Sequence, residues 1–121
     1  MTTNYIDNIL HFDKLNLLDV AKTHKTPFYI YSENIIERNF NSYHKSLGDN
    51  SHMICYSVKA NSNLSILSCL AKLGSGFDIV SAGELSRIIY AGGDPQKTVF
   101  SGVGKTEEEI GYALDKDILC F

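Results

Sequence analysis

Lys59 is the residue whose type and position best suit covalent chemistry. It follows the apolar run 53–56 within the segment YSVKAN at 56–61. If that run is a strand of a parallel sheet, Lys59 stands at its carboxyl end, where the active sites of such folds collect. A pocket that disfavours the ammonium lowers a lysine pKa from ~10.4 to ~7–8, which frees the amine to form a Schiff base. Position alone leaves open the alternative that Lys59 is a solvated charge at a strand end.

Two further motifs carry weaker signals. Glu84 closes the segment SAGE at 81–84, which has the spacing of a capping box. Glu84 could cap the helix or support the active site from behind, and the sequence does not choose between these two compatible roles. The segment SGVGK at 101–105 lacks the spacing of a Walker phosphate loop. We interpret its glycines as allowing a tight turn, with Lys105 as a solvated or mouth-lining charge. No histidine or cysteine has metal-site spacing, so we predict no metal.

Five short apolar runs predict strands that are buried on both faces. They span residues 28–31, 53–56, 77–80, 98–100 and 118–121. Nearly continuous apolar character is typical of a parallel sheet. Four stretches with helical period lie between these runs. The first is predicted to start at Ser32 and stop at Gly48, and the second to start at Asn63 and end at Gly74. The third starts before Leu85 and ends at Gly92-Gly93. The fourth starts with a capping box at Thr106-Glu107-Glu108-Glu109.

The alternation of strands and helices predicts a right-handed parallel α/β fold. Periodicity alone does not separate a doubly wound sheet from half of a (β/α)₈ barrel. A complete barrel needs ~250 residues, and this chain has 121, so we expect a chain truncated at Phe121. Residues 1–25 lie outside the repeat, with a lone strand predicted at 8–12 and a short helix at 17–24. We assign residues 1–25 to a second substructure and residues 26–121 to the repeat.

Composition excludes several classes of partner. The net charge of −3 provides no basic field for nucleic acid or an anionic membrane. The longest uncharged stretch, 60–71, is much shorter than the ~20 apolar residues of a spanning helix. No basic leader is visible, and an odd count of three cysteines suits a reducing compartment. We therefore expect a cytoplasmic protein.

The segment around Lys59 also carries a family resemblance. YSVKANSN at 56–63, followed by Ile66, Leu67, Leu70 and Gly74, closely resembles the pyridoxal-phosphate (PLP) attachment segment of the ornithine/diaminopimelate/arginine decarboxylase family. That family usually has alanine where this chain has Ser57. The segments at 26–31, 74–85 and 100–110 are similar to the family in the same order, and the last two look like its diaminopimelate-specific members.

The resemblance implies a fold-type III PLP enzyme: a partial (β/α)₈ TIM barrel of the alanine racemase-like type, about half of it present. Residues 26–121 would be this first half, and the strand within 1–25 would join a β-rich domain of a homodimer. Lys59 would be the catalytic, PLP-bearing lysine. Asp78 would lie beside the cofactor and tune Lys59, with a purely structural role as the alternative. The implied reaction converts meso-2,6-diaminopimelate to L-lysine and CO₂, in lysine biosynthesis.

Other functions compete with this one. The family's residues for gripping the phosphate and the pyridine nitrogen come later than Phe121, so we expect the isolated chain to be inactive. A decarboxylase for ornithine, arginine or a polyamine precursor is the runner-up. A non-catalytic PLP-binding barrel protein is a second alternative. A generic doubly wound phosphate-binding domain ranks last, because residues 32–34 are Ser-Glu-Asn where it would need a glycine-rich loop.

Overall fold

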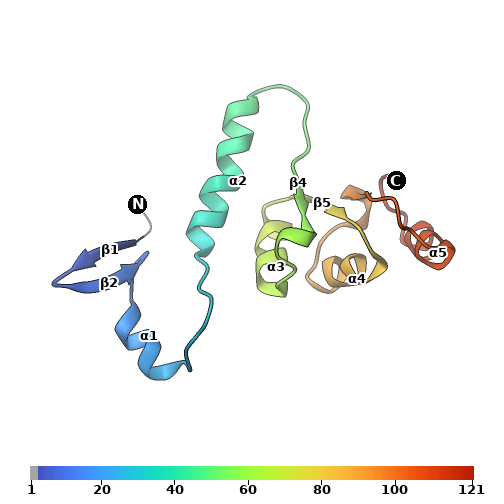
Figure 1. Cartoon of the computed structure of the whole chain (residues 1–121). Helices are drawn as coiled ribbons and strands as arrows, with labels where there is room; N and C mark the ends of the chain where they lie inside the picture. Colours follow the sequence, from blue (N-terminus) through green and yellow to red (C-terminus); the bar gives the residue numbers. More distant parts are fainter. Residues whose placement is uncertain (1–2) are drawn as a thin grey trace. The chain divides into compact units, whose positions relative to one another are not determined.

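The computed structural model describes residues 3–121, which form two units divided between Ile35 and Ile36 (Figure 1). The first unit contains strands β1 (Thr3–Ile6), β2 (Ile9–Phe12) and β3 (Leu15–Asn16), in an antiparallel sheet of that order, and helix α1 (Leu17–Thr23). The second contains the parallel sheet and most of the helices.

The strand predicted at 8–12 is confirmed as β2, but it is not a lone strand. It pairs with β1 on one side and β3 on the other. Asp7 and Asn8 form the two-residue loop between β1 and β2, and both have positive φ angles of 49° and 61°. Such loops suit the twist of a hairpin, and Asn and Asp tolerate this backbone region. β1 and β3 were missed because both are short and largely exposed.

The strand predicted at 28–31 is wrong. These residues have no regular secondary structure, and Tyr29 is 90% exposed. A strand persists only when its backbone groups are paired with a neighbour. Neither sheet in the described part of the chain includes this segment, so its apolar and aromatic character alone did not produce a strand.

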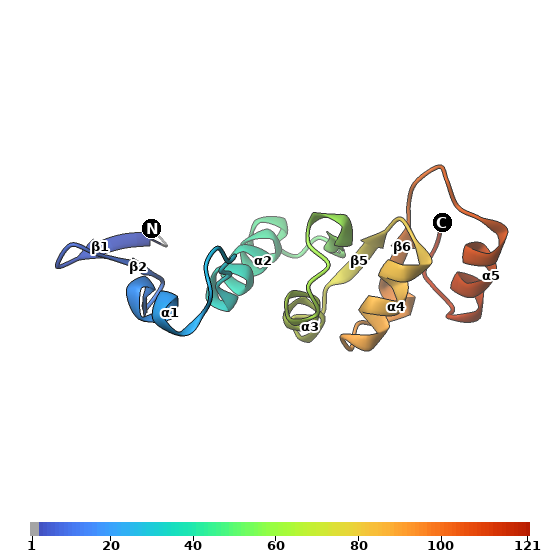
Figure 2. The ribbon, with the colours of Figure 1, turned by 60° about the horizontal axis from the view of Figure 1, so that its bottom comes forward.

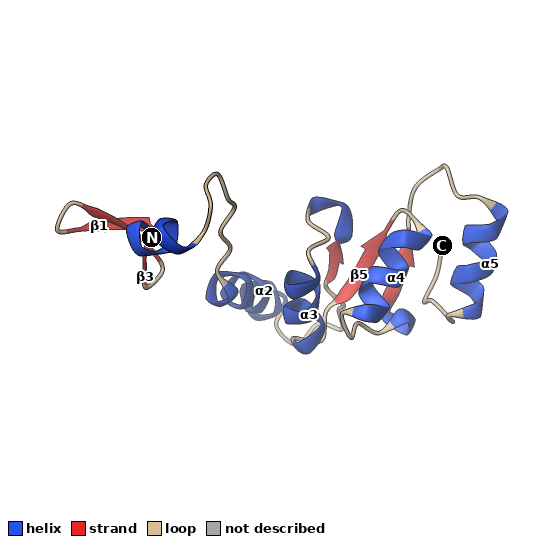
Figure 3. Ribbon diagram, turned by 90° about the horizontal axis from the view of Figure 1, so that it is seen from below, coloured by secondary structure: helices blue, strands red, loops and turns tan. Residues whose placement is uncertain are grey.

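The parallel sheet consists of β4 (Cys55–Ser57), β5 (Gly76–Ile79) and β6 (Thr98–Phe100), in that order (Figure 3). These strands confirm the predictions at 53–56, 77–80 and 98–100 to within two residues. The strand predicted at 118–121 forms only in part. Cys120 makes a parallel bridge to Val99, and the Phe100 amide donates to the Cys120 carbonyl over 2.9 Å.

The helices follow the predicted order, and they are α2 (Glu33–Leu47), α3 (Leu64–Lys72), α4 (Ala82–Tyr90) and α5 (Glu107–Asp115). Two single-turn 3-10 helices, η1 (Val58–Ala60) and η2 (Pro95–Lys97), complete the chain. The predicted caps are confirmed at Ser32, Asn63 and Thr106, and the last is a full capping box with Glu109. Within residues 3–121, no helix has the length and apolar character needed to span a membrane.

The two faces of the parallel sheet differ in character. Phe77, Ile79 and Phe100 are fully buried, and they form one apolar cluster with residues of α3, α4 and α5. These three helices lie side by side along the sheet (Figure 2). Side chains alternate between faces along a strand, so Asp78 points to the opposite face, which is only half-buried. Burial on both faces was predicted, but Cys55, Ser57, Asp78 and Val99, on the face opposite the helices, are only half-buried.

We predict that Gly76→Ala destabilises the second unit. A Cβ atom at Gly76 would lie 2.6 Å from the Lys97 backbone oxygen and 2.8 Å from the Cys55 sulfur. Backbone cannot yield as a flexible side chain does, so we expect the free energy of unfolding to fall by about 1–3 kcal/mol in denaturant titration.

Gly111→Ala is the matched control for this substitution. Gly111 lies inside α5, and a Cβ atom added there would have open space around it. Alanine there should raise the free energy of unfolding by about 0.5–1 kcal/mol, because glycine is a poor helix residue. Equal effects of the two substitutions would contradict the close approach at Gly76.

Candidate functional site

The carboxyl edge of the parallel sheet collects three polar side chains. Ser57 ends β4 and pairs in register with Asp78 on β5. Ser101 follows the last residue of β6, and its amide donates to the Ile79 carbonyl over 2.8 Å. Asp78 pairs with Val99, so Ser101, two residues further along, faces the same side as Asp78. The register therefore brings these three residues together.

Asp78 accepts one hydrogen bond on each carboxylate oxygen. The Ser57 hydroxyl donates to Oδ2 over 2.7 Å, and the Ser101 hydroxyl donates to Oδ1 over 2.5 Å. Partial burial acts to raise the pKa of Asp78, but the hydrogen bonds from Ser101 and Ser57 and the charge of Lys59 together hold that pKa below its usual value. Asp78 is therefore a fixed negative charge near neutral pH.

Lys59 lies directly beyond the end of β4, as predicted. It is the middle residue of η1, between the fully buried Val58 and the exposed Ala60. Its own side chain is exposed, and its charge is near enough to lower the pKa of Asp78. The desolvating pocket expected around this amine is not formed by the described residues. What the chain does provide is an accessible primary amine whose charge acts on an ionised carboxylate.

The loop that carries Lys59 is held by hydrogen bonds to its backbone. The Tyr56 hydroxyl donates to the Asn61 carbonyl over 3.1 Å, and the Asn61 side chain accepts from the Asn63 amide over 3.0 Å. Arg87, from α4, donates to the Ser62 carbonyl over 2.8 Å. These contacts fix the path of the chain between β4 and α3, and so the position of the lysine.

Glu84 makes the contacts of a helix cap. Its amide donates to the Ser81 hydroxyl over 3.3 Å, and its carboxylate accepts from the Val80 amide over 2.8 Å. Its carboxylate therefore reaches one residue further back than the predicted box, to Val80 in place of Ser81. A supporting role near Lys59 remains a prediction.

The segment at 101–105 forms a tight turn, as its glycines predicted. Gly102 has a φ of +89°, a region that L side chains rarely adopt. Lys105 closes the turn by donating to the Gly102 carbonyl over 2.6 Å, and its amine lies 5.2 Å from the centre of the Phe100 ring. Lys105 is half-buried, and its ammonium is hydrogen-bonded to a backbone carbonyl. These contacts give Lys105 a structural role.

Several contacts at the site were not found from the sequence. Neither hydroxyl contact to Asp78 was predicted, although parallel-strand register would have placed Ser57 beside it. Cys55 lies on the same face, and burial together with the charges of Asp78 and Cys120 raises the pKa of its thiol. The site therefore contains a neutral thiol.

Outside this site, His44 and His52 of the second unit form a hydrogen bond of 2.7 Å despite their separation in sequence.

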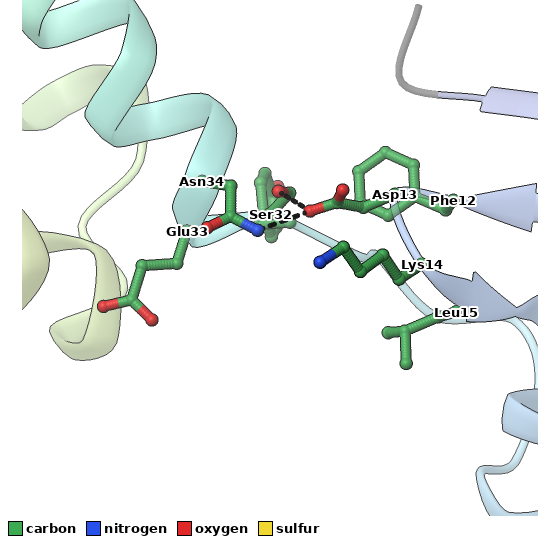
Figure 4. A pocket seen from close by; sticks show the side chains of 8 residues that line it. Phe12, Asp13, Lys14, Leu15, Ser32, Glu33 and Asn34 are labelled. Atoms are coloured by element: carbon green, nitrogen blue, oxygen red, sulfur yellow. Dashed lines mark hydrogen bonds between the residues drawn. The ribbon is translucent and has the colours of Figure 1, made fainter.

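A separate pocket of about 270 Å³ lies in the first part of the chain (Figure 4). Its polar centre is Asp13, whose Oδ2 accepts from the Ser32 hydroxyl and the Asn34 side-chain Nδ2, each over 2.9 Å. Figure 4 shows both side chains pointing toward Asp13. The pocket contains neither Lys59 nor Asp78, and its contacts tie the start of α2 to the loop after β2.

We predict that Asp78 makes stability depend on pH in the acid range. A folded pKa below the ordinary value of 3.8 stabilises the fold above that value, and this contribution is lost as the pH falls through the folded pKa. The free energy of unfolding should therefore drop less on acidification to about pH 3 in Asp78→Asn than in the wild type.

Denaturant titrations near neutral pH and near pH 3 measure this difference. Asp115→Asn, at the exposed end of α5, controls for the removal of a carboxylate from the surface. An Asp78→Asn protein that loses as much stability as the wild type would contradict the assignment.

The fold and the site together define an α/β protein whose reactive groups gather at the carboxyl edge of a parallel sheet. Residues 33–121 match the family described as pyridoxal-dependent decarboxylase, pyridoxal binding domain. The chain belongs to this family. The resemblance identified around Lys59 is thereby confirmed, and it extends over most of the chain.

Comparison with individual relatives gives the same result. The chain is 56% identical over 115 residues to diaminopimelate decarboxylase of Vibrio cholerae, covering 95% of this chain and 28% of the relative. It resembles the crystal structure of diaminopimelate decarboxylase from Helicobacter pylori in complex with L-lysine, with a TM-score of 0.83 and 50% identity over 86% of this chain and 26% of that one. SrLDC in complex with PLP and cadaverine is more distant, with a TM-score of 0.79 and 28% identity over 98% and 29% of the two chains. The chain thus spans less than a third of its relatives' length.

Proposed function

We propose that the protein containing this chain is a PLP-dependent carboxy-lyase that converts meso-2,6-diaminopimelate to L-lysine and CO₂. The observation that carries this proposal is Lys59, an accessible amine beyond the end of β4 whose charge acts on the ionised Asp78. It stands in a chain of the pyridoxal binding domain family whose relative from Vibrio cholerae is a diaminopimelate decarboxylase.

The residues of this chain fit a covalently held aldehyde cofactor. Lys59 would hold PLP through its amine, which condenses with the aldehyde with release of one water. Asp78 would provide a negative charge on the same side of the sheet, where its carboxylate interacts electrostatically with Lys59. When bound, PLP supplies an electron sink for the pair left behind by departing CO₂. The chain itself supplies the amine, the negative charge and the rigid strand ends that orient both.

The sheet supports a partial (β/α)₈ barrel in place of a doubly wound fold. β4, β5 and β6 lie in sequential order, and α3, α4 and α5 all pack into the core of one face. A doubly wound sheet reverses its strand order and carries helices on both faces, whereas a barrel keeps helices on its outer face alone. In this proposal residues 26–121 are the first half of the barrel, Asp78 faces its interior, and residues 1–25 belong with a β-rich domain.

The wider assignments follow from the same family membership. We propose a cytoplasmic homodimer that serves lysine biosynthesis, with Glu84 supporting the site from the start of α4. A decarboxylase for another basic amino acid is the second candidate. The chain also resembles the lysine decarboxylase from Selenomonas ruminantium, with 29% identity, and SrLDC in complex with PLP and cadaverine. Higher identity to diaminopimelate decarboxylases favours the first candidate.

We predict that Lys59→Ala abolishes covalent attachment of PLP in the full-length protein. Borohydride reduction followed by peptide mass spectrometry should find the pyridoxyl group on Lys59 in the wild type and on no residue of the variant. CO₂ release should fall by at least about 10³-fold, because the variant has no amine with which to hold the cofactor.

Lys72→Ala, at the exposed end of α3, is the control and should retain both properties. A pyridoxyl group on another lysine of the wild type, or full activity of Lys59→Ala, would contradict the proposal.

The substrate is tested by comparing kcat/KM of the full-length protein for several amino acids. We predict that meso-diaminopimelate is preferred over lysine, ornithine and arginine by at least about 10²-fold. A pocket that hydrogen-bonds both the amino and the carboxyl group at the far end of this substrate is left with unpaired polar groups of its own when a substrate lacks one of them. A preference for ornithine, arginine or lysine would support the second candidate instead.

A further inference from the structure

Two serine hydroxyls grip Asp78 from neighbouring strand ends. We propose that Ser57 and Ser101 are positioning residues, which hold the Asp78 carboxylate in one orientation so that its charge acts on the Lys59 amine. The effect on Lys59 rests on the function proposed above. The two-serine grip, by which we mean the hydrogen bonds from Ser57 and Ser101 to Asp78, rests on the described contacts alone.

The geometry restrains the carboxylate in two ways. Ser57 donates to Oδ2 and Ser101 donates to Oδ1, so rotation of the Asp78 carboxylate breaks both hydrogen bonds. A serine side chain has a single rotatable heavy-atom bond, and both serines lie at strand ends whose backbone is paired with β5. Short donors on rigid elements position a charged group more closely than loop residues do.

Among the described residues, Lys59 is the cation that acts on the Asp78 carboxylate. Lys59 acts on Asp78 from η1. From β4, Cys55 is held as a neutral thiol. From α4, Glu84 is occupied with the Val80 amide. β6, Thr98–Phe100, contains no titratable residue. Hydroxyl donors favour the ionised carboxylate, so the two serines would extend the pH range over which Lys59 has an anionic neighbour.

The grip is tested first without cofactor. Carboxyl ¹³C NMR of the 121-residue chain measures the titration of Asp78 in the wild type, Ser57→Ala, Ser101→Ala and the conservative Ser57→Thr. Loss of one donor to a charged group should raise the Asp78 pKa by about one unit. Ser57→Thr keeps the hydroxyl and should restore the wild-type titration.

Ser65→Ala, on the exposed side of α3, is the matched control and should not move the Asp78 titration. An Asp78 pKa that is unchanged in both Ser57→Ala and Ser101→Ala, or one that Ser57→Thr does not restore, overturns the proposal. If Ser57→Ala disturbs the sheet, Ser101→Ala and the Ser57→Thr rescue still decide the result.

The link to Lys59 is tested in the full-length protein loaded with PLP. The amount of pyridoxyl-Lys59 trapped by cyanoborohydride, which survives in mild acid, is measured against pH. Its acid limb should be displaced upward by about one unit in Ser57→Ala and restored in Ser57→Thr. An acid limb that is identical in wild type and Ser57→Ala overturns the inference while leaving the proposed function intact. Absence of trapped pyridoxyl-Lys59 in the wild type overturns the proposed function, whatever the NMR result.

Discussion

The register of the parallel sheet is the constraint on which the site depends. Pairing of Ser57 with Asp78 and of Asp78 with Val99 places the carboxylate on the face opposite the helices. A slip by one residue would turn Asp78 into the apolar cluster around Phe77 and Ile79. An ionised carboxylate there would lose its hydration without compensation. Burial of Phe77 and Ile79 and the partial exposure of Asp78 on the opposite face therefore favour the same register.

Local contacts at the helix starts extend this constraint beyond the sheet. Glu109 completes the capping box of α5 with Thr106 and also accepts from the Ala82 amide at the start of α4 over 3.0 Å. The hydrogen bond from the Ala82 amide and, second, the one from the Thr106 amide hold the pKa of the half-buried Glu109 below its usual value. The loops after β5 and β6, which frame Asp78 and Ser101, are thus tied to each other through one carboxylate.

Local signals predicted most of the second unit. Asn63, Ser81 and Thr106 have side chains that cap helices whatever lies elsewhere in the chain, and all three caps are present. Residues 28–31 have strand-like composition but pair with no strand within residues 3–121, so the prediction failed there. Lys59 and Asp78 were identified from motif and position. Their connection through two serines could not be, because it depends on which residues the register sets side by side.

The central claim is that Lys59 and Asp78 form one side of a PLP site at this sheet edge. A crystal structure of the full-length protein with PLP tests it most directly. The account predicts continuous electron density from Lys59 Nζ to the cofactor, with the Asp78 carboxylate still held between Ser57 and Ser101. Density for PLP bound elsewhere, with Lys59 directed into solvent and Asp78 turned away from it, would contradict the account.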